Sequence, residues 1–227
     1  MIGSVVIVDD VAVAFAALVA KRMAATDSRE FSLAFSGGST ARKCYESLAL
    51  STTSIEWNRL QAWWGDERCV PLDHLDSNFR LAKESLLSHI GPLAGLHPMN
   101  SAVPNAAQVY NDLVGAAAAI DLVHLGLGPD AHTASLFPGS EALSSPSGDL
   151  VVFNTDPLGS NPHKRMTFTF EGISRCRSAV ITVAGEEKRQ AFQRVLDGDL
   201  SAPASRIDGQ DVTWLVDHEA MGPRTGR

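Results

Sequence analysis

An acid–base pair lies near the middle of the sequence, where Asp130 and His132 follow the run Gly126-Leu127-Gly128. A carboxylate two positions from an imidazole can orient the ring and tune its charge, and imidazole groups titrate near neutrality. Of the seven histidines only His132 has this setting, whereas His124 lies inside an apolar run that predicts a packed core residue. His132 is therefore the candidate general base, with Asp130 as its partner.

A loop that suits an anion follows an earlier apolar run, as Ser36-Gly37-Gly38-Ser39-Thr40. The two glycines let the backbone approach a ligand closely, and the N–H groups and the hydroxyls of Ser39 and Thr40 can donate to oxygens. The Gly-Lys-Ser/Thr ending of a Walker motif is missing, so ATP hydrolysis is not supported. The alternative is an ordinary turn from strand to helix, with Ser39 or Thr40 as the N-cap.

Two carboxylates and a guanidinium follow another apolar run, in Gly65-Asp66-Glu67-Arg68. If the strand continues, Asp66 and Glu67 face opposite ways, and only one of them points into a site. The alternative is a surface turn with a weak ion pair between Glu67 and Arg68.

Two further cations lie beside predicted strands. Arg165 opens the predicted strand 166–170, and Lys188 lies in the first turn of a helix that follows the predicted strand 179–183 and Gly185. Point charges and forked donors of this kind bind phosphate. Each of these side chains taken alone is most often a solvated surface charge, so the prediction depends on all four clusters sharing one edge of a sheet.

The elements that must position these residues alternate along the chain. We expect strands at 5–8, 31–35, 60–64, 120–127, 150–153, 166–170, 179–183 and 212–216, with helices between most of them. Continuous apolar strands alternating with helices predict an α/β fold, a three-layer sandwich whose mostly parallel sheet has helices on both faces. We expect one domain over residues 1–227, and the carboxyl ends of its strands are where ligands bind.

Composition excludes several classes of protein. The chain has 227 residues, 44% of them hydrophobic, and a formal charge of −7. It is therefore not disordered, and it lacks the excess of basic residues expected for binding nucleic acid or a membrane surface. The three widely spaced cysteines without a CxxC motif predict reduced thiols, no thiolate metal site and a cytoplasmic location.

The sequence resembles the 6-phosphogluconolactonase family over nearly its whole length. Five segments match the family's pattern in order: Ser36–Thr40, Gly65–Arg68, Gly126–Gly139, Arg165–Thr169 and Gly185–Lys188. The run His-Thr-Ala-Ser-Leu-Phe-Pro-Gly within the third segment is specific, and the tail from Ala202 to Asp217 also looks like the family's. The resemblance implies a fold related to that of glucosamine-6-phosphate deaminase.

The deaminase is the natural rival, because it shares the Ser-Gly-Gly-Ser-Thr loop and an Asp-x-His pair. Its pattern has a glutamate where this chain has Phe137 and a tyrosine where this chain has Arg68, so the resemblance favours the lactonase.

Two features depart from the lactonase pattern. Ala131 replaces a glycine, which costs about 1 kcal/mol or more if φ is positive there, and Lys164 ends an altered loop, so we leave it out of the site.

The resemblance implies metal-free hydrolysis of 6-phospho-D-glucono-1,5-lactone in the oxidative pentose phosphate pathway, without a cofactor. The implied catalytic residues are His132, Asp130 and Asp66, and the implied substrate- and phosphate-binding residues are Gly37, Gly38, Ser39, Thr40, Arg68, Arg165 and Lys188. We expect a monomer or weak dimer with a small sugar-phosphate ligand and no nucleic-acid or membrane partner. The alternatives are a sugar-phosphate sensor without turnover, and an isomerase or deaminase with Asp66 as its base.

Overall fold

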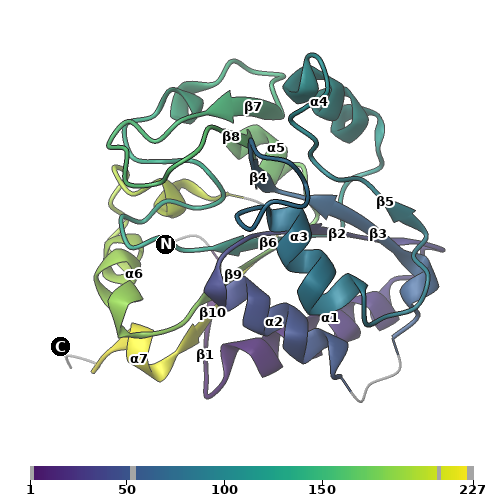
Figure 1. Cartoon of the computed structure of the whole chain (residues 1–227). Helices are drawn as coiled ribbons and strands as arrows, with labels where there is room; N and C mark the ends of the chain where they lie inside the picture. Colours follow the sequence, from purple (N-terminus) through teal and green to yellow (C-terminus); the bar gives the residue numbers. More distant parts are fainter. Residues whose placement is uncertain (1–2, 52–54, 209–210, 224–227) are drawn as a thin grey trace.

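A sheet of parallel strands forms the centre of the computed structural model, which describes residues 3–51, 55–208 and 211–223 (Figure 1). Within these residues it has seven strands in the order β1-β10-β9-β6-β2-β3-β5, and every neighbouring pair is parallel. The strands are β1 (Ser4–Val8), β2 (Phe31–Phe35), β3 (Leu60–Trp64), β5 (Gly95–Leu96), β6 (Leu122–Gly126), β9 (Ala179–Val183) and β10 (Val212–Asp217).

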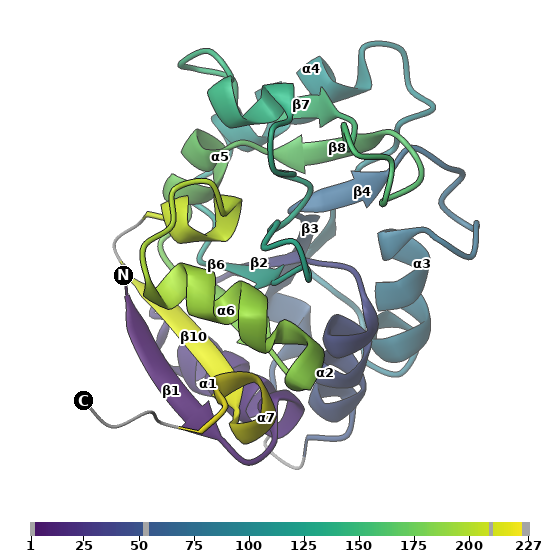
Figure 2. The same ribbon diagram turned by 90° about the vertical axis from the view of Figure 1, so that its left-hand side faces the viewer.

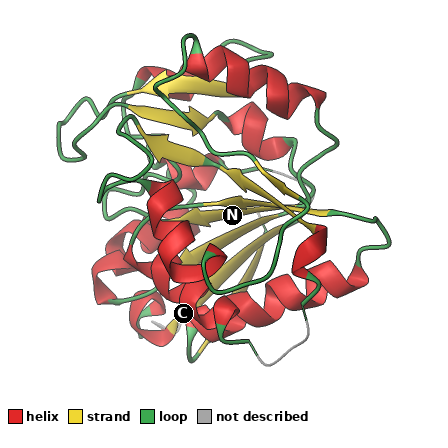
Figure 3. Ribbon diagram, turned by 45° about the vertical axis from the view of Figure 1, so that its right-hand side comes forward, coloured by secondary structure: helices red, strands yellow, loops and turns green. Residues whose placement is uncertain are grey.

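Helices cover both faces of this sheet, as the apolar strands predict. Every residue of β9 is buried, which is typical of a strand with helices on both sides. Figures 1 and 3 show α1 (Val11–Ala25), α2 (Ser39–Ala49) and α3 (Asn78–Ala82) on one side, and α4 (Ala106–Ala116) and α5 (Phe170–Ser174) on the other. The predicted three-layer α/β fold with a mostly parallel sheet is confirmed.

The remaining helical segments are short and lie mainly near the ends of strands. Helix α6 (Arg189–Leu196) packs on β10, where the rings of Phe192 and Trp214 lie 5.7 Å apart (Figure 2). The others are α7 (His218–Met221), the π-helical turn η2 (Lys83–Leu87) and the 3₁₀ turns η1 (Trp57–Arg59), η3 (Glu141–Ser144), η4 (Glu186–Lys188) and η5 (Pro203–Arg206). Among the described helices, none combines the length and the apolar character needed to cross a membrane.

The order of the strands reverses between β2 and β6. From β2 the chain proceeds outward to β3 and β5, whereas from β6 it proceeds in the other direction to β9 and β10. The loops that leave β2 and β6 therefore diverge from neighbouring strands and open a crevice between them. This is the position at which parallel α/β sheets bind ligands.

A second sheet, which the sequence did not predict, overhangs this crevice. It is antiparallel, in the order β4 (Asp66–Arg68), β8 (Arg165–Phe168), β7 (Val151–Asn154). The expected strands at 150–153 and 166–170 thus form, but outside the parallel sheet. The chain passes from β3 through Gly65 into β4 without a helix, and β8 stops before Thr169, whose hydroxyl caps α5 by accepting from the Gly172 N–H.

A capping side chain marks the start of α1 and of α3, but no capping side chain marks the start of α2. The side chain of Asp10 accepts from the N–H groups of Ala12 and Val13, and Ser77 caps α3 in the same way. At α2 the N-cap is Gly38, at φ 98°, and no side chain caps the helix. The alternative in which Ser39 or Thr40 caps this helix is therefore wrong.

Glu67 fastens the start of α3 to β4. Its carboxylate accepts four hydrogen bonds, from the N–H groups of Arg68, Asn78 and Phe79 and from the Ser77 hydroxyl, at 2.7–3.0 Å. Burial raises the pKa of Glu67, and the backbone N–H donors oppose that shift. Consecutive side chains of a strand point to opposite sides. Glu67 in β4 therefore binds the start of α3, while Asp66 faces the crevice.

We expect Glu67→Ala to lower the free energy of unfolding by about 2–4 kcal/mol, because several buried donors lose their acceptor at once. Urea denaturation of the purified protein measures the change. Glu46→Ala, at an exposed position of α2, is the matched control and should have little effect. Equal effects of the two substitutions would contradict the anchoring role of Glu67.

Candidate active site

A cavity of about 190 Å³ opens at the carboxyl ends of β2, β3, β6 and β9. It lies in the crevice between the loops that leave β2 and β6, where the strand order reverses. Nine of the ten sequence-predicted site residues line it: Gly37, Gly38, Ser39, Thr40, Asp66, Arg68, His132, Arg165 and Lys188. The tenth, Asp130, lies behind His132 and contacts its ring.

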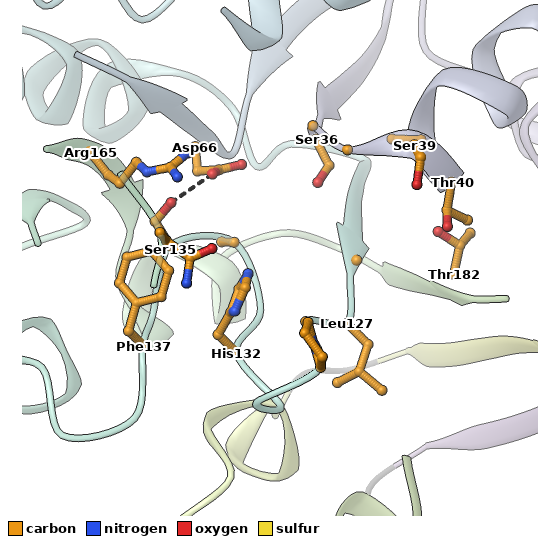
Figure 4. A pocket seen from close by; sticks show the side chains of 18 of the residues that line it. Ser36, Ser39, Thr40, Asp66, Leu127, His132, Ser135, Phe137, Arg165 and Thr182 are labelled. Atoms are coloured by element: carbon orange, nitrogen blue, oxygen red, sulfur yellow. Dashed lines mark hydrogen bonds between the residues drawn. The ribbon is translucent and has the colours of Figure 1, made fainter. Parts of the chain in front are cut away.

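His132 presents Nδ1 of its ring to a carboxylate, and Nε2 has no hydrogen-bond partner among the residues that the structure describes. Its Nδ1 lies 2.5 Å from Oδ1 of Asp130, which also accepts from the His132 backbone N–H. Burial acts to raise the pKa of Asp130, but the hydrogen bonds and charge of His132 outweigh it, so the pKa is lowered. An ionised carboxylate can only accept, so Nδ1 carries the proton and Nε2 of a neutral ring keeps its lone pair. Figure 4 shows the ring pointing into the cavity.

The loop that carries this pair is shaped by residues without large side chains. A Cβ on Gly128 would lie 2.2 Å from Nδ1 of His132 and 2.7 Å from Oδ1 of Asp130, so only glycine leaves room for the pair. Ala131 has φ 69° and Ala134 has φ 48°, both in the left-handed region. The family's glycine at residue 131 thus matches a positive φ, and alanine bears a cost of about 1 kcal/mol or more there.

Contacts from the C-terminal part of the chain hold this strained loop in place. The backbone N–H of Ala204, in η5, donates to the Ala131 carbonyl at 3.1 Å. Nη1 of Arg194, in α6, donates to the Asp130 carbonyl at 3.0 Å. The segment around η5, which the resemblance singled out, therefore supports the Asp130–His132 loop without lining the cavity.

Asp66 is fixed by two residues that sequence reasoning missed. Its Oδ2 accepts from the Ser135 hydroxyl at 2.7 Å, and its Oδ1 accepts from Nδ2 of Asn78 at 3.2 Å. The amide oxygen of Asn78 is buried and occupies the space that a Cβ on Gly37 would need. Gly37 is therefore required for close approach of α3, and Asn78 joins the loop after β2 to β4. A lone asparagine after a cap residue carried no signal for this role.

Two guanidinium groups lie opposite each other at one end of the cavity. Arg68 and Arg165 are cross-strand partners in β4 and β8, an arrangement of like charges that destabilises a sheet. Each donates one Nη to a backbone carbonyl, and both buried Nε atoms lack a partner among the described residues. Burial lowers the pKa of Arg165, and the carboxylate of Asp66 opposes that shift. This end of the cavity therefore carries two positive charges that attract an anion.

The opposite end of the cavity is formed by the loop after β2 and the connection after β9. Figure 4 shows Ser39, Thr40 and Thr182 on one side of the cavity, and Arg165, Asp66 and Ser135 on the other. The uncapped start of α2 and Lys188 both line the cavity. A helix start without a side-chain cap attracts negative charge. His132 thus lies between two groups of anion-binding donors.

Two residues that the sequence analysis left outside the site do not line the cavity. His124 is fully buried, as expected, and burial lowers its pKa to about 3. The ammonium of Lys164 lies 4.1 Å from the centre of the Phe153 ring, so this residue belongs to the outer surface of β7. Within residues 3–51, 55–208 and 211–223, no group of histidine, cysteine, aspartate or glutamate side chains is arranged to hold a metal ion.

The fold and the cavity define an α/β protein whose cavity brings cationic side chains and a helix start together with a histidine. The model of the family described as glucosamine-6-phosphate isomerases/6-phosphogluconolactonase matches residues 7–215, and the chain belongs to this family. A 6-phosphogluconolactonase of Synechocystis is 38% identical over 204 residues, which cover 83% of this chain and 82% of that protein.

Solved structures agree with this membership. The 6-phosphogluconolactonase of Trypanosoma brucei superposes with a TM-score of 0.85 at 26% identity, covering 96% of this chain and 97% of that one. A monomeric glucosamine-6-phosphate deaminase has a TM-score of 0.82 at 20% identity, covering 96% of this chain and 98% of that one. The second likeness shows a shared fold. The resemblance noted in the sequence is therefore confirmed as family membership.

We expect Gly128→Ala to break the hydrogen bond between His132 Nδ1 and Asp130 and to cost about 1–3 kcal/mol of stability through overpacking. The Nδ1-bound proton of His132 in ¹H–¹⁵N NMR spectra reports the bond directly. Gly115→Ala in α4 is the control, because the nearest atom to its new Cβ, Leu150 Cδ1, is 3.8 Å away. A persistent Nδ1 proton signal in the Gly128 variant would contradict this account of the loop.

Proposed function

We propose that the chain hydrolyses 6-phospho-D-glucono-1,5-lactone to 6-phosphogluconate, the lactonase step of the oxidative pentose phosphate pathway, and does so in the cytoplasm. Membership of the family and the relatives named 6-phosphogluconolactonase support this activity. One observation carries the choice of substrate: the cavity has anion-binding donors at both ends with His132 between them. The product of this reaction carries a phosphate at one end and a carboxylate at the other.

The phosphate binds where α2 begins. Here the N–H groups at Gly38, Ser39 and Thr40 are not used by a side-chain cap, and Lys188 supplies a full positive charge. Gly38, at φ 98°, permits the turn that directs these groups toward the ligand. The dianion is thereby held at a fixed distance from His132, which positions the lactone ring for attack.

The lactone carbonyl lies toward Arg68 and Arg165. We assign Arg165 to this end because its cross-strand partner is Arg68 and because it lies beside Asp66, across the cavity from Ser39 and Thr40 (Figure 4). The two guanidinium groups stabilise the oxyanion as it forms, and later the product carboxylate. Asp66 fixes Ser135 beside them and limits the net positive charge of this end.

Hydrolysis then needs one base and one water molecule. Nε2 of His132 takes a proton from water as the water oxygen attacks the lactone carbonyl carbon, and the tetrahedral intermediate carries its negative charge toward the arginines. When the bond between that carbon and the ring oxygen breaks, His132 returns the proton to the ring oxygen. Asp130 holds the ring with Nδ1 protonated through both steps. A δ-lactone is reactive enough for this mechanism without a covalent intermediate.

The alternative reaction is deamination or isomerisation of a sugar phosphate, with Asp66 as the base. Both carboxylate oxygens of Asp66 already accept hydrogen bonds, and Phe137, where the deaminase pattern has glutamate, packs edge to face on His132 at 5.0 Å. A direct comparison separates the two. The same preparation should release protons from the lactone in a pH-stat, above the uncatalysed rate, and release no ammonia from glucosamine 6-phosphate. The reverse pattern would reject the proposed function.

We expect His132→Gln to reduce kcat by about 10²–10⁴-fold, because the general base is lost. Binding of 6-phosphogluconate, measured by calorimetry, should remain within a few-fold of the original protein because the anion-binding donors are untouched. Turnover near the original rate in this variant would remove His132 from the chemistry.

We expect Lys188→Ala to raise KM about 10-fold or more with a smaller change in kcat, because it removes a charge-assisted contact to the phosphate in both ground and transition states. Steady-state kinetics over a range of lactone concentrations measures both constants. Lys43→Ala, at an exposed position of α2, serves as the control for a lost surface charge. An unchanged KM in the Lys188 variant would place this residue outside the phosphate site.

A further inference from the structure

A chain of buried polar groups runs beneath the phosphate end of the cavity. The backbone N–H of Ser36 donates to the Tyr45 hydroxyl at 2.7 Å, and that hydroxyl lies 2.9 Å from Nδ1 of His124. On its other side, Nε2 of His124 lies 2.9 Å from the hydroxyl of Thr182, a buried residue that lines the cavity. The loop after β2 and strand β9 are thus joined through a histidine that the mechanism above does not use.

The histidine in this chain carries one ring proton. Burial lowers the pKa of His124 to about 3, so the ring is neutral at physiological pH. A neutral imidazole has one donor and one acceptor nitrogen, and therefore the chain has a direction. Two arrangements of protons form all the hydrogen bonds of this chain. They differ in whether the hydroxyl proton of Thr182 is used by His124.

In the first arrangement, His124 Nδ1 donates to Tyr45, which donates in turn to the Ser36 carbonyl at 3.1 Å. Nε2 then accepts the Thr182 proton, and the threonine has nothing to give to a ligand. In the second arrangement, Tyr45 donates to Nδ1 and Nε2–H donates to Thr182 Oγ1. The Thr182 proton is then free to enter a hydrogen bond in the cavity.

We propose that Thr182 donates a hydrogen bond to the phosphate group of the ligand, and that Tyr45 and His124 are positioning residues that select the second arrangement when a phosphate is bound. A phosphate dianion offers only acceptors, so it requires the Thr182 proton. The proposal rests on the proposed function for the identity of the ligand. Figure 4 shows Thr182 at the end of the cavity where Ser39 and Thr40 lie.

A second buried group, the thiol of Cys44, also interacts with the Thr182 hydroxyl. Burial raises the pKa of Cys44 to about 12, so it remains a thiol. A thiol sulfur is a weak acceptor compared with a phosphate oxygen. When phosphate enters, the Thr182 hydroxyl therefore keeps its proton and donates its hydrogen bond to a phosphate oxygen in place of Cys44 or His124.

The first test is a pair of substitutions at Thr182. Thr182→Val should raise KM for 6-phosphogluconolactone by about 10-fold or more with kcat within about 2-fold, whereas Thr182→Ser, which keeps the hydroxyl, should stay within about 3-fold in both. Thr213→Val, on the neighbouring strand β10 and outside the cavity, is the matched control. If the original protein hydrolyses the lactone and Thr182→Val leaves KM unchanged, the assignment of Thr182 is overturned.

A binding experiment keeps this test independent of the reaction. The dissociation constant of inorganic phosphate should rise by about 10-fold or more in Thr182→Val and change little in Thr182→Ser. If the original protein binds phosphate with this dependence but does not hydrolyse the lactone, the proposed function fails and the phosphate site stands. Equal phosphate affinity in all three proteins, or no phosphate binding by the original protein, would overturn the site.

The second test reads the proton arrangement itself. In ¹⁵N NMR spectra of the protein saturated with 6-phosphogluconate, His124 should carry its proton on Nε2, with Nδ1 as the acceptor. Tyr45→Phe removes the donor to Nδ1, so His124 should lose this preference and KM should rise while kcat stays within about 2-fold. A purely structural role for Tyr45 would lower the melting temperature without moving the tautomer. A ligand-bound His124 with its proton on Nδ1 would overturn the proposal.

Discussion

The constraint on which the whole site depends is that parallel strands all end at the same edge of their sheet. Strands β3, β2, β6 and β9 are neighbours, so the polar segments that follow them have to meet. The reversal of strand order between β2 and β6 then opens a space where these segments converge. The general-base candidate, the anion-binding loop and Lys188 come from three different connections. In an antiparallel arrangement of the same strands, the general-base candidate, which follows β6, would lie at the opposite edge from the other two.

The small antiparallel sheet adds what the parallel sheet cannot supply. It places Arg68 and Arg165 opposite each other, a pairing that costs stability unless an anion lies between or beside the guanidinium groups. The repulsion between the two guanidinium groups is local to this short sheet. Its first strand is held to α3 by the hydrogen bonds of Glu67. The chain as a whole has a charge of −7, yet its cavity is lined by three Lys and Arg side chains and one carboxylate, Asp66. Net charge bears on the kind of large partner expected, whereas the positions of a few residues decide how a small anion is attracted.

Much of the fold and of the site was predictable because it depends on residues that are close together in the sequence. Apolar strands and the pairing of residues 130 and 132 depend on spacings of a few residues. The residues that sequence reasoning missed act across the chain instead. Ser135 and Asn78 contact Asp66 although they are 69 and 12 residues away from it in the sequence. Thr182 contacts His124 across a separation of 58 residues. No periodicity or spacing marks such contacts.

The sequence by itself determined the alternation of strands and helices, the acid–base pair and the family to which the chain belongs, because short-range geometry and motif order suffice for these. The tertiary structure alone decided which residues line the cavity, the strained backbone at Ala131 and the need for glycine at residue 128. These properties depend on how close atoms from distant segments come, and steric exclusion and desolvation act over a few ångströms of space whatever the distance along the chain.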